Sequence, residues 1–192
     1  DLDNHTVRLG GINLSQSELK NLEHIILVGC GTAHYASKLA AYYIEKFVPG
    51  LTFEAVVASE YRYRNAYIPK NSVAIIVSQS GETADTLACL RSIKQQGIKT
   101  IGIVNAIGST IAREVDGGTY VHVGPEISVA STKAFTSQAV TIIMFGLMIA
   151  QAKGIGLTIL QPFIEEIANL PNQIEKMLKT LPDQIKTVAK KY

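Results

Sequence analysis

The chain has 192 residues, of which 47% are hydrophobic and 18% are charged, and its formal net charge is +2. A chain of this length and composition can bury a substantial core, and it fits one domain with an appended segment better than two domains. Its lysines and arginines are dispersed rather than gathered in the basic stripe of nucleic-acid-binding proteins, so we expect no nucleic-acid partner.

The sequence predicts neither a membrane span nor a secretory signal. Its longest apolar stretch, residues 139–150, is shorter than the roughly 20 residues that a bilayer span requires, so we expect a buried helix there. Residues 1–5 carry neither a basic start nor an apolar run, which favours a cytoplasmic location. Cys30 and Cys89 form no metal-ligand cluster, and no metal or cofactor is expected; a disulfide between them is allowed by number but rare in the cytosol.

Apolar runs alternate with helical patterns along the chain. The runs typical of strands are residues 24–29, 52–59, 73–79, 99–105 and 119–124, and the helical patterns between and after them are residues 33–48, 83–96 and 132–153. Most of the strand runs are continuously apolar, which is typical of parallel strands covered by helices on both faces. We therefore predict a doubly wound α/β domain with a five-stranded parallel sheet in flavodoxin-like order.

Turns and further helices complete the prediction. Residues 69–71 and 116–118 carry turn residues immediately before strands. Beyond residue 155 we expect helices without another strand, beginning near Gln161, near Pro171 and after Pro182. Their apolar faces lack an obvious partner within the chain.

The run after the third strand, residues 78–83, is the first candidate binding site. It reads Ser-Gln-Ser-Gly-Glu-Thr at the start of a predicted helix, and ligands of open parallel sheets bind beyond the carboxyl ends of the strands. A helix N-terminus offers unpaired N–H groups, and Gly81 allows close approach of the backbone, so this run can bind an anion such as phosphate. It fits equally an ordinary helix cap, with Ser80 as the capping residue and Thr83 in the first turn. These residues alone leave both interpretations open.

The run after the first strand superficially resembles a dinucleotide-binding fingerprint. The third glycine of that fingerprint would fall on His34, whose bulk opposes the close helix–strand approach that glycine permits. No Gly-Lys-Ser/Thr sequence follows a glycine-rich loop either, so nucleotide binding is not predicted.

Several chemically reactive residues have structural interpretations. The loop of residues 124–133 brings hydroxyl groups to the same crevice, and Lys133 at its end is interpreted as structural or electrostatic, because a solvated lysine stays protonated. Cys30 fits a tight turn, Cys89 fits the core, and Glu82 fits a favourable charge in the first turn of a helix. The scattered histidines predict neither a metal site nor a catalytic dyad.

Two long runs carry a resemblance to a known family. Residues 78–86 (Ser-Gln-Ser-Gly-Glu-Thr-Ala-Asp-Thr) and 129–138 (Val-Ala-Ser-Thr-Lys-Ala-Phe-Thr-Ser-Gln) resemble the first sugar isomerase (SIS) domain of glucosamine-6-phosphate synthases, also called glutamine-fructose-6-phosphate transaminases. Shorter matches lie at residues 30–32, within residues 58–64 and within residues 108–114. The resemblance covers nearly the whole chain and implies an SIS domain over residues 1–155, with a short N-terminal extension. Residues 156–192 would then form a helical segment leading toward a second SIS domain.

The resemblance implies a site for fructose 6-phosphate or glucosamine 6-phosphate. The binding residues that it implies are Thr32, Ala33, Ser78, Gln79, Ser80, Thr83, Val129 through its backbone, and Ser131. Ala33 departs from the family, which usually has a serine there. We expect the backbone N–H of Ala33 to remain available and the phosphate contact to be weakened rather than lost. A neutral hydrogen bond is worth on the order of 1 kcal/mol, so affinity should fall several-fold.

The resemblance also implies what this segment lacks. The family makes glucosamine 6-phosphate from fructose 6-phosphate and glutamine, on the way to UDP-N-acetylglucosamine. It takes its N-terminal cysteine nucleophile from a preceding glutaminase domain, and its catalytic Glu, His and Lys from a second SIS domain, the partner subunit and the C-terminal tail. Residue 1 here is Asp1, so we expect a segment that binds substrate, contains no catalytic residue of its own and does not turn substrate over. The unpaired apolar faces after Pro171, together with the family's habit of dimerising through these domains, predict a homodimer.

Two other functions fit the same residues. One is a non-catalytic sugar phosphate sensor, in which the same site would control a partner. The other is a small phosphosugar isomerase that works as an oligomer and uses groups such as His34 and Glu126 across subunits.

Overall fold

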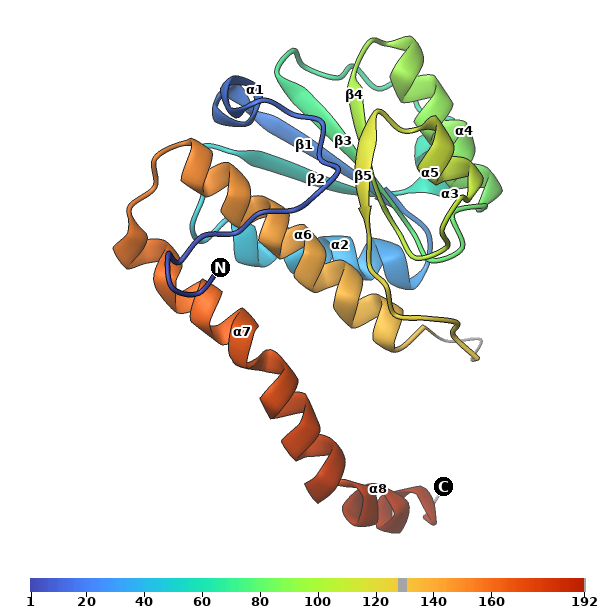
Figure 1. Ribbon diagram of the computed structural model, residues 1–192. Coiled ribbons are helices and arrows are strands. Elements are labelled where there is room, and N and C mark those ends of the chain that lie inside the picture. Colours follow the sequence, from blue (N-terminus) through green and yellow to red (C-terminus); the bar gives the residue numbers. More distant parts are fainter. Residues whose placement is uncertain (128–130, 192) are drawn as a thin grey trace.

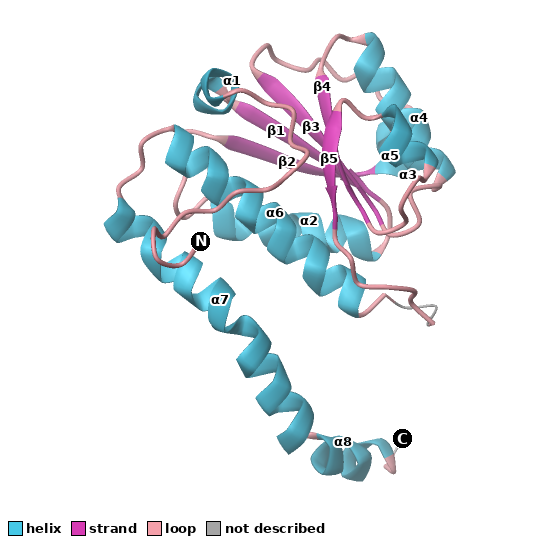
Figure 2. Ribbon diagram, in the orientation of Figure 1, coloured by secondary structure: helices cyan, strands magenta, loops and turns pink. Residues whose placement is uncertain are grey.

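The computed structural model describes residues 1–127 and 131–191, and it forms one parallel sheet with helices on both faces (Figures 1 and 2). The strands are β1 (His24–Gly29), β2 (Thr52–Val57), β3 (Ser72–Ser78), β4 (Lys99–Val104) and β5 (Gly117–Tyr120). They lie in the order β2-β1-β3-β4-β5, and every neighbouring pair is parallel. The predicted fold class and strand order are confirmed.

Helices bury both faces of the sheet and so explain the continuously apolar strands. One hydrophobic cluster joins the sheet to α2 (Thr32–Ile44), α6 (Lys133–Ala152) and the start of α7 (Leu157–Thr180). The second cluster joins the opposite face to α3 (Ala58–Tyr61), α4 (Ala84–Gln95) and α5 (Thr110–Glu114). Alternate residues of a strand point to opposite faces, so a strand between two helical layers needs apolar side chains throughout.

The helix α6 contains the longest apolar stretch of the sequence. In the described part of the chain it is the one helix whose length and composition would suffice to cross a membrane, with a mean hydropathy of 1.5. Half of the 18-residue window of α6 with this hydropathy is nevertheless buried within the fold, where Ile142, Phe145 and Leu147 pack against α2 and the sheet. The expected buried helix is confirmed.

The N-terminal arm, residues 7–14, crosses α6 and reaches the outer edge of β5 (Figure 1). The N–H of Gly118 donates to the carbonyl of Gly11 at 2.8 Å, and Nδ2 of Asn13 donates to the carbonyl of Asp116 at 2.7 Å. The prediction of a turn at 116–118 was wrong, because Gly117 and Gly118 belong to β5. Both glycines are explained by packing, since a Cβ on Gly118 would lie 2.5 Å from a backbone oxygen of β4.

A short helix, α1 (Gln16–Asn21), precedes β1 and was not predicted. Its start has a capping box, in which the Ser15 hydroxyl accepts from the N–H of Glu18 and the Glu18 carboxylate accepts from the N–H of Ser15. The Ser-x-x-Glu spacing was therefore a usable sequence signal for this helix.

The C-terminal helices differ from the prediction in their boundaries. Residues 157–180 form one continuous helix, α7, with Pro162 and Pro171 inside it, whereas the sequence predicted separate helices beginning near these prolines. A proline removes one backbone hydrogen bond and strains a helix, but it does not force the helix to end. The start of α7 packs on the core through Phe163, whose ring lies 4.8 Å from that of Phe47. The rest of α7 extends away from the sheet toward α8 (Pro182–Ala189) (Figure 1).

Candidate functional site

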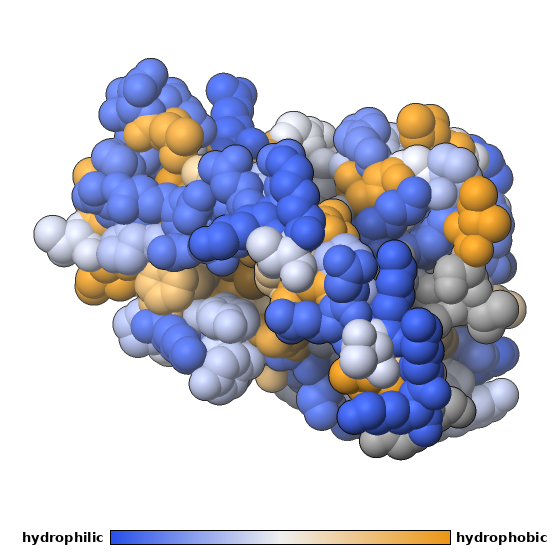
Figure 3. Space-filling view, turned by 90° about the horizontal axis from the view of Figure 1, so that it is seen from below, coloured by the Kyte–Doolittle hydropathy of each residue, from blue (hydrophilic) through white to orange (hydrophobic). Residues whose placement is uncertain are grey.

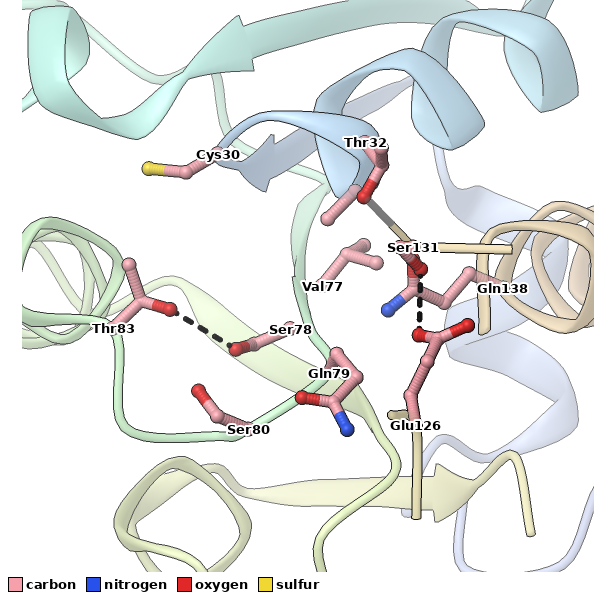
Figure 4. Close-up of a pocket in the computed structure, with 11 residues that line it drawn as sticks. Cys30, Thr32, Val77, Ser78, Gln79, Ser80, Thr83, Glu126, Ser131 and Gln138 are labelled. Carbon is pink, nitrogen blue, oxygen red and sulfur yellow. Dashed lines mark hydrogen bonds between the residues drawn. The ribbon is translucent and has the colours of Figure 1, made fainter. Parts of the chain in front are cut away.

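A cavity of about 240 Å³ opens beyond the carboxyl ends of β1 and β3 (Figure 4). The chain leaves β1 toward β2 on one side and continues through β3 to β5 on the other, so the two strands flank the topological switch point of the sheet. Open α/β sheets bind their ligands at this point. The lining residues are Cys30, Thr32, Ala33, Val77, Ser78, Gln79, Ser80, Thr83, Glu126, Ser131 and Gln138.

The loop of residues 78–83 forms one wall of the cavity and presents hydroxyl groups to it. The buried Ser78 hydroxyl accepts from the N–H of Gly81 at 3.0 Å and lies 3.4 Å from the Thr83 hydroxyl (Figure 4). The Ser80 hydroxyl accepts from the N–H of Glu82 at 3.2 Å. These bonds fold the loop into a tight turn whose side chains can donate to an anion through neutral O–H groups.

The 78–83 loop is braced from behind by the start of α5. The carbonyl of Gly81 accepts from the N–H of Ile111, and the Glu82 carboxylate accepts from the N–H of Thr110 at 2.7 Å. This bond from Thr110 lowers the pKa of Glu82. Glu82 therefore holds the loop against α5. The prediction that it lies in the first turn of the helix was wrong, because α4 begins only at Ala84.

Two helix N-termini point at the cavity without side-chain caps. The N-cap of α4 is Thr83 and that of α2 is Gly31, and neither makes a side-chain capping hydrogen bond among the described residues. Of the two interpretations left open by the sequence, the one with Ser80 as the cap of α4 was wrong, because the Ser80 hydroxyl bonds to the N–H of Glu82 within the loop. Uncapped N-termini carry unpaired N–H groups and a partial positive charge, so the cavity favours a ligand with an anionic group.

Ala33 lies on the wall of the cavity and is 6% exposed. Its backbone N–H donates to the carbonyl of Cys30 at 3.2 Å. The expectation that this N–H stays available to a ligand was therefore wrong, because the turn between β1 and α2 already uses it. Position 33 offers the ligand neither a side-chain donor nor a free backbone donor.

Restoring the hydroxyl at this position should strengthen binding. The Ala33→Ser variant should bind fructose 6-phosphate several-fold more tightly than the wild type, because one added neutral hydrogen bond is worth on the order of 1 kcal/mol. Isothermal titration of both proteins measures the difference. Ala36→Ser, fully buried one turn further along α2, serves as the control and should bring no gain. Equal affinities of Ala33→Ser and wild type would contradict the prediction.

Glu126 supplies the negative charge of the cavity, and its carboxylate accepts hydrogen bonds from residues at the start of α6. Its carboxylate accepts from the N–H of Thr132 at 2.6 Å and from the hydroxyls of Ser131 and Thr132 at 2.9 and 3.0 Å. The hydrogen bond from the N–H of Thr132 is the main cause of a pKa lowered to about 2. Glu126 therefore stays ionised and fills the N-terminus of α6 that would otherwise bind an external anion.

The depressed pKa of Glu126 predicts a pH dependence of stability. A carboxyl group whose pKa is lower in the folded chain stabilises the fold above its unfolded value, near 4.5, and this contribution is lost as the pH falls toward 2. Glu126→Gln should therefore be less stable than the wild type at pH 7, and the difference should shrink between pH 5 and pH 2. Thermal unfolding at several pH values measures it, with Glu45→Gln at the exposed end of α2 as the control. A difference that is constant with pH would contradict the assignment.

The structure brings together the residues that the sequence singled out. Thr32, Ala33, Ser78, Gln79, Ser80, Thr83 and Ser131 all line the one cavity, and Val129 lies outside the described residues. Glu126 and Gln138 also line it but were not assigned to the site. A signal existed for Gln138, because it is a polar residue at the edge of the longest apolar stretch.

Two other candidates, Lys133 and Cys89, make the structural contacts expected of them. Lys133 donates to the carbonyl of Pro125 at 2.8 Å and does not line the cavity. Cys89 is buried, donates to the carbonyl of Ala58, and has its pKa raised to about 11 by desolvation. The described residues contain no cluster of side chains suited to a metal ion.

The fold and cavity define a class: a doubly wound α/β domain that offers hydroxyl groups and helix N-termini to a small anionic ligand at its switch point. Residues 18–148 match the model of the SIS domain family. The chain therefore belongs to the SIS domain family.

Two relatives that match nearly the whole chain have the same name. The chain is 41% identical over 190 residues to the glutamine–fructose-6-phosphate aminotransferase [isomerizing] of Clostridium acetobutylicum. The aligned region covers 97% of this chain and 31% of that protein. It is 37% identical over 188 residues to form 2 of the human enzyme, covering 98% of this chain and 26% of that one. The chain thus spans about a third or less of the length of these relatives.

A solved structure agrees in fold. The C-terminal domain of glucosamine-fructose-6-phosphate aminotransferase from Francisella tularensis superposes with a TM-score of 0.88 at 34% identity. The match covers 96% of this chain and 52% of that one.

Proposed function

We propose that this chain is the fructose 6-phosphate-binding SIS domain of a glutamine–fructose-6-phosphate aminotransferase, with glucosamine 6-phosphate as the product at the same site. The observation that carries the proposal is the 78–83 loop at the uncapped N-terminus of α4, since its hydroxyls and the helix terminus together suit a phosphate. The names of the relatives supply the sugar.

The phosphate binds at the 78–83 loop, where Ser78, Ser80 and Thr83 donate to its oxygens and the α4 N-terminus supports its charge. The sugar extends from there toward Thr32 and Ser131 across the cavity. This placement of phosphate and sugar at opposite ends of the cavity fits the charges of the lining residues. The ionised Glu126 beside Ser131 repels a phosphate but can accept hydrogen bonds from sugar hydroxyls.

The chain binds its ligand without converting it. Aldose–ketose isomerisation needs a general base and acid that can exchange protons with the sugar. Among the described residues that line the cavity there is no histidine or lysine, and the one carboxylate, Glu126, is held ionised by four donors. Ring opening, isomerisation and amino transfer would then depend on further parts of the enzyme, a glutaminase domain and a second SIS domain.

Residues 1–155 form the SIS domain in this proposal, and residues 156–192 form the helical segment leading to the second SIS domain. The chain functions in the cytoplasm as a homodimer. An apolar groove of about 530 Å³ between α2, α6 and α7 supports association. Exposed apolar residues on α7 and α8, among them Met177, Leu178 and Ile185, add to it. Seen from below, apolar areas reach the surface at several places between hydrophilic ones (Figure 3).

Titration of the 192-residue chain with fructose 6-phosphate tests the proposal, combined with NMR detection of glucose 6-phosphate in the same sample. We expect saturable binding and no conversion, with affinity reduced several-fold in Ser80→Ala. Absence of binding would overturn the assignment of the ligand. Formation of glucose 6-phosphate by the chain alone would overturn the assignment as a binding domain and favour a complete phosphosugar isomerase.

A further inference from the structure

The side chain of Gln138 lines the cavity, and the proposed phosphate site does not use it. Gln138 lies in the second turn of α6 and is 1% exposed. Neither its amide nitrogen Nε2 nor its amide oxygen Oε1 has a hydrogen-bond partner among the described residues. In Figure 4 its carboxamide lies beside Ser131 and points toward the interior of the cavity.

A buried side-chain amide without hydrogen bonds lowers the stability of the fold, so a partner for it is expected. Within the described part of the chain, neither the amide donor nor the amide acceptor of Gln138 is paired. The other buried positions of α6 hold alanine, glycine, isoleucine, leucine or phenylalanine. A glutamine at the cavity wall is therefore poorly suited to packing alone but well suited to a polar ligand.

We infer that Gln138 is a sugar-recognition residue, which pairs with a hydroxyl group of the bound sugar phosphate rather than with its phosphate. This inference rests on the proposed function and extends it to the opposite end of the cavity.

The donor and acceptor inventory distinguishes the two ends of the ligand. A phosphate dianion only accepts hydrogen bonds, so it could satisfy Nε2 but would leave Oε1 unpaired. A hydroxyl group both donates and accepts, so sugar hydroxyls can accept from Nε2 and donate to Oε1. The two unpaired atoms of Gln138 together thus match a polyol better than a phosphate.

The surroundings of Gln138 agree with this assignment. Its neighbours at this end of the cavity are Ser131 and the ionised carboxylate of Glu126, and that negative charge disfavours a phosphate there. In Figure 4 the hydroxyl groups of Ser78, Ser80 and Thr83 lie away from Ser131 and Gln138, and Thr83 is the N-cap of α4. The cavity is therefore divided into an anion end and a hydroxyl end, and Gln138 belongs to the hydroxyl end.

Gln138→Leu tests the inference, because leucine fills a similar volume without polar atoms. We expect its affinity for fructose 6-phosphate to fall about tenfold, through the loss of one or two hydrogen bonds. Its affinity for inorganic phosphate, followed through the amide resonances of the 78–83 loop, should stay within about twofold of the wild-type value. The melting temperature should be unchanged or higher, because the substitution removes two unpaired polar atoms from the interior.

A matched control lies on the same helix. Gln151 holds the N-terminal arm by accepting from the N–H of Val7 and donating to the carbonyl of His5, both at 3.2 Å. Gln151→Leu should therefore lower the melting temperature and leave both affinities unchanged, which is the opposite pattern.

The outcomes separate this inference from the proposed function. If the wild-type chain does not bind fructose 6-phosphate, both fall together. If it binds and Gln138→Leu binds equally well, only the role of Gln138 is overturned. An equal loss of affinity for fructose 6-phosphate and inorganic phosphate would place Gln138 at the anion end or make it a structural support, and either result overturns the inference.

Discussion

Gly81→Ala should lower the affinity of the chain for fructose 6-phosphate by at least about 100-fold. Gly81 has a φ of +67°, a left-handed conformation that costs a residue with a Cβ roughly 1–2 kcal/mol. The added Cβ would also lie 2.0 Å from the hydroxyl oxygen of Ser109, well inside contact distance. The 78–83 loop must then move away from α5, and its hydroxyls can no longer converge on a phosphate. Isothermal titration measures the loss.

Two variants separate the causes of this effect. Gly97 has a φ of +75° but nothing within 4 Å of an added Cβ, and it lies at the end of α4 far from the cavity. Gly97→Ala should therefore lower stability by about 1 kcal/mol without changing affinity. The double variant Gly81→Ala, Ser109→Gly removes the clash and should recover part of the lost affinity. Wild-type affinity in Gly81→Ala would show that the loop does not hold the ligand.

Gly146→Val should lower the free energy of unfolding by about 3 kcal/mol, a large part of the stability of a typical domain. Gly146 lies where α6 crosses α2, and an added Cβ would sit 2.6 to 2.8 Å from three side-chain atoms of Ile44. Ile44 is 1% exposed and packs within the hydrophobic core. The two helices must therefore separate or Ile44 must leave its rotamer. Urea unfolding should show a lower midpoint with an unchanged slope.

A double variant tests whether the contact between these two residues is the cause. Ile44→Ala alone should destabilise the chain by leaving a cavity. In the Gly146→Val background it makes room for the valine, so the two effects should be strongly non-additive. Gly10→Val provides the control, because nothing lies within 4 Å of a Cβ at position 10. Additive effects would mean that the α2–α6 contact does not limit the size of residue 146.

The sequence predicted the sheet well because buried parallel strands leave a distinct pattern. A run such as residues 73–77 is apolar at every position, which is the pattern of a short strand between two helical layers. The prediction failed where long-range contacts override local preference. Gly117 and Gly118 resemble a turn in sequence, but they form a strand because the N-terminal arm and β4 approach them too closely for side chains. Nothing local to these glycines indicates that approach.

The site was predictable to the extent that it follows strand ends. Parallel strands bring the loops that follow β1 and β3 to one edge, so Thr32 and Ser78 could be placed together from their positions alone. The hydrogen-bond partners of individual groups in the site were not predictable from the sequence. The N–H of Ala33 is used by its own turn, and the Glu126 carboxylate is used by the start of α6. Both depend on backbone geometry that residue identities do not determine.

The N-terminal arm has a consequence for how the chain behaves among its own copies. β5 is an edge strand, and the unpaired backbone groups of such a strand can bind the edge of another sheet and start aggregation. Part of this edge is covered by the arm, because Gly11 accepts from the N–H of Gly118 and Asn13 donates to the carbonyl of Asp116. The arm thus occupies backbone groups at the edge of the sheet that could otherwise pair with another chain, although its residues lie far from the cavity.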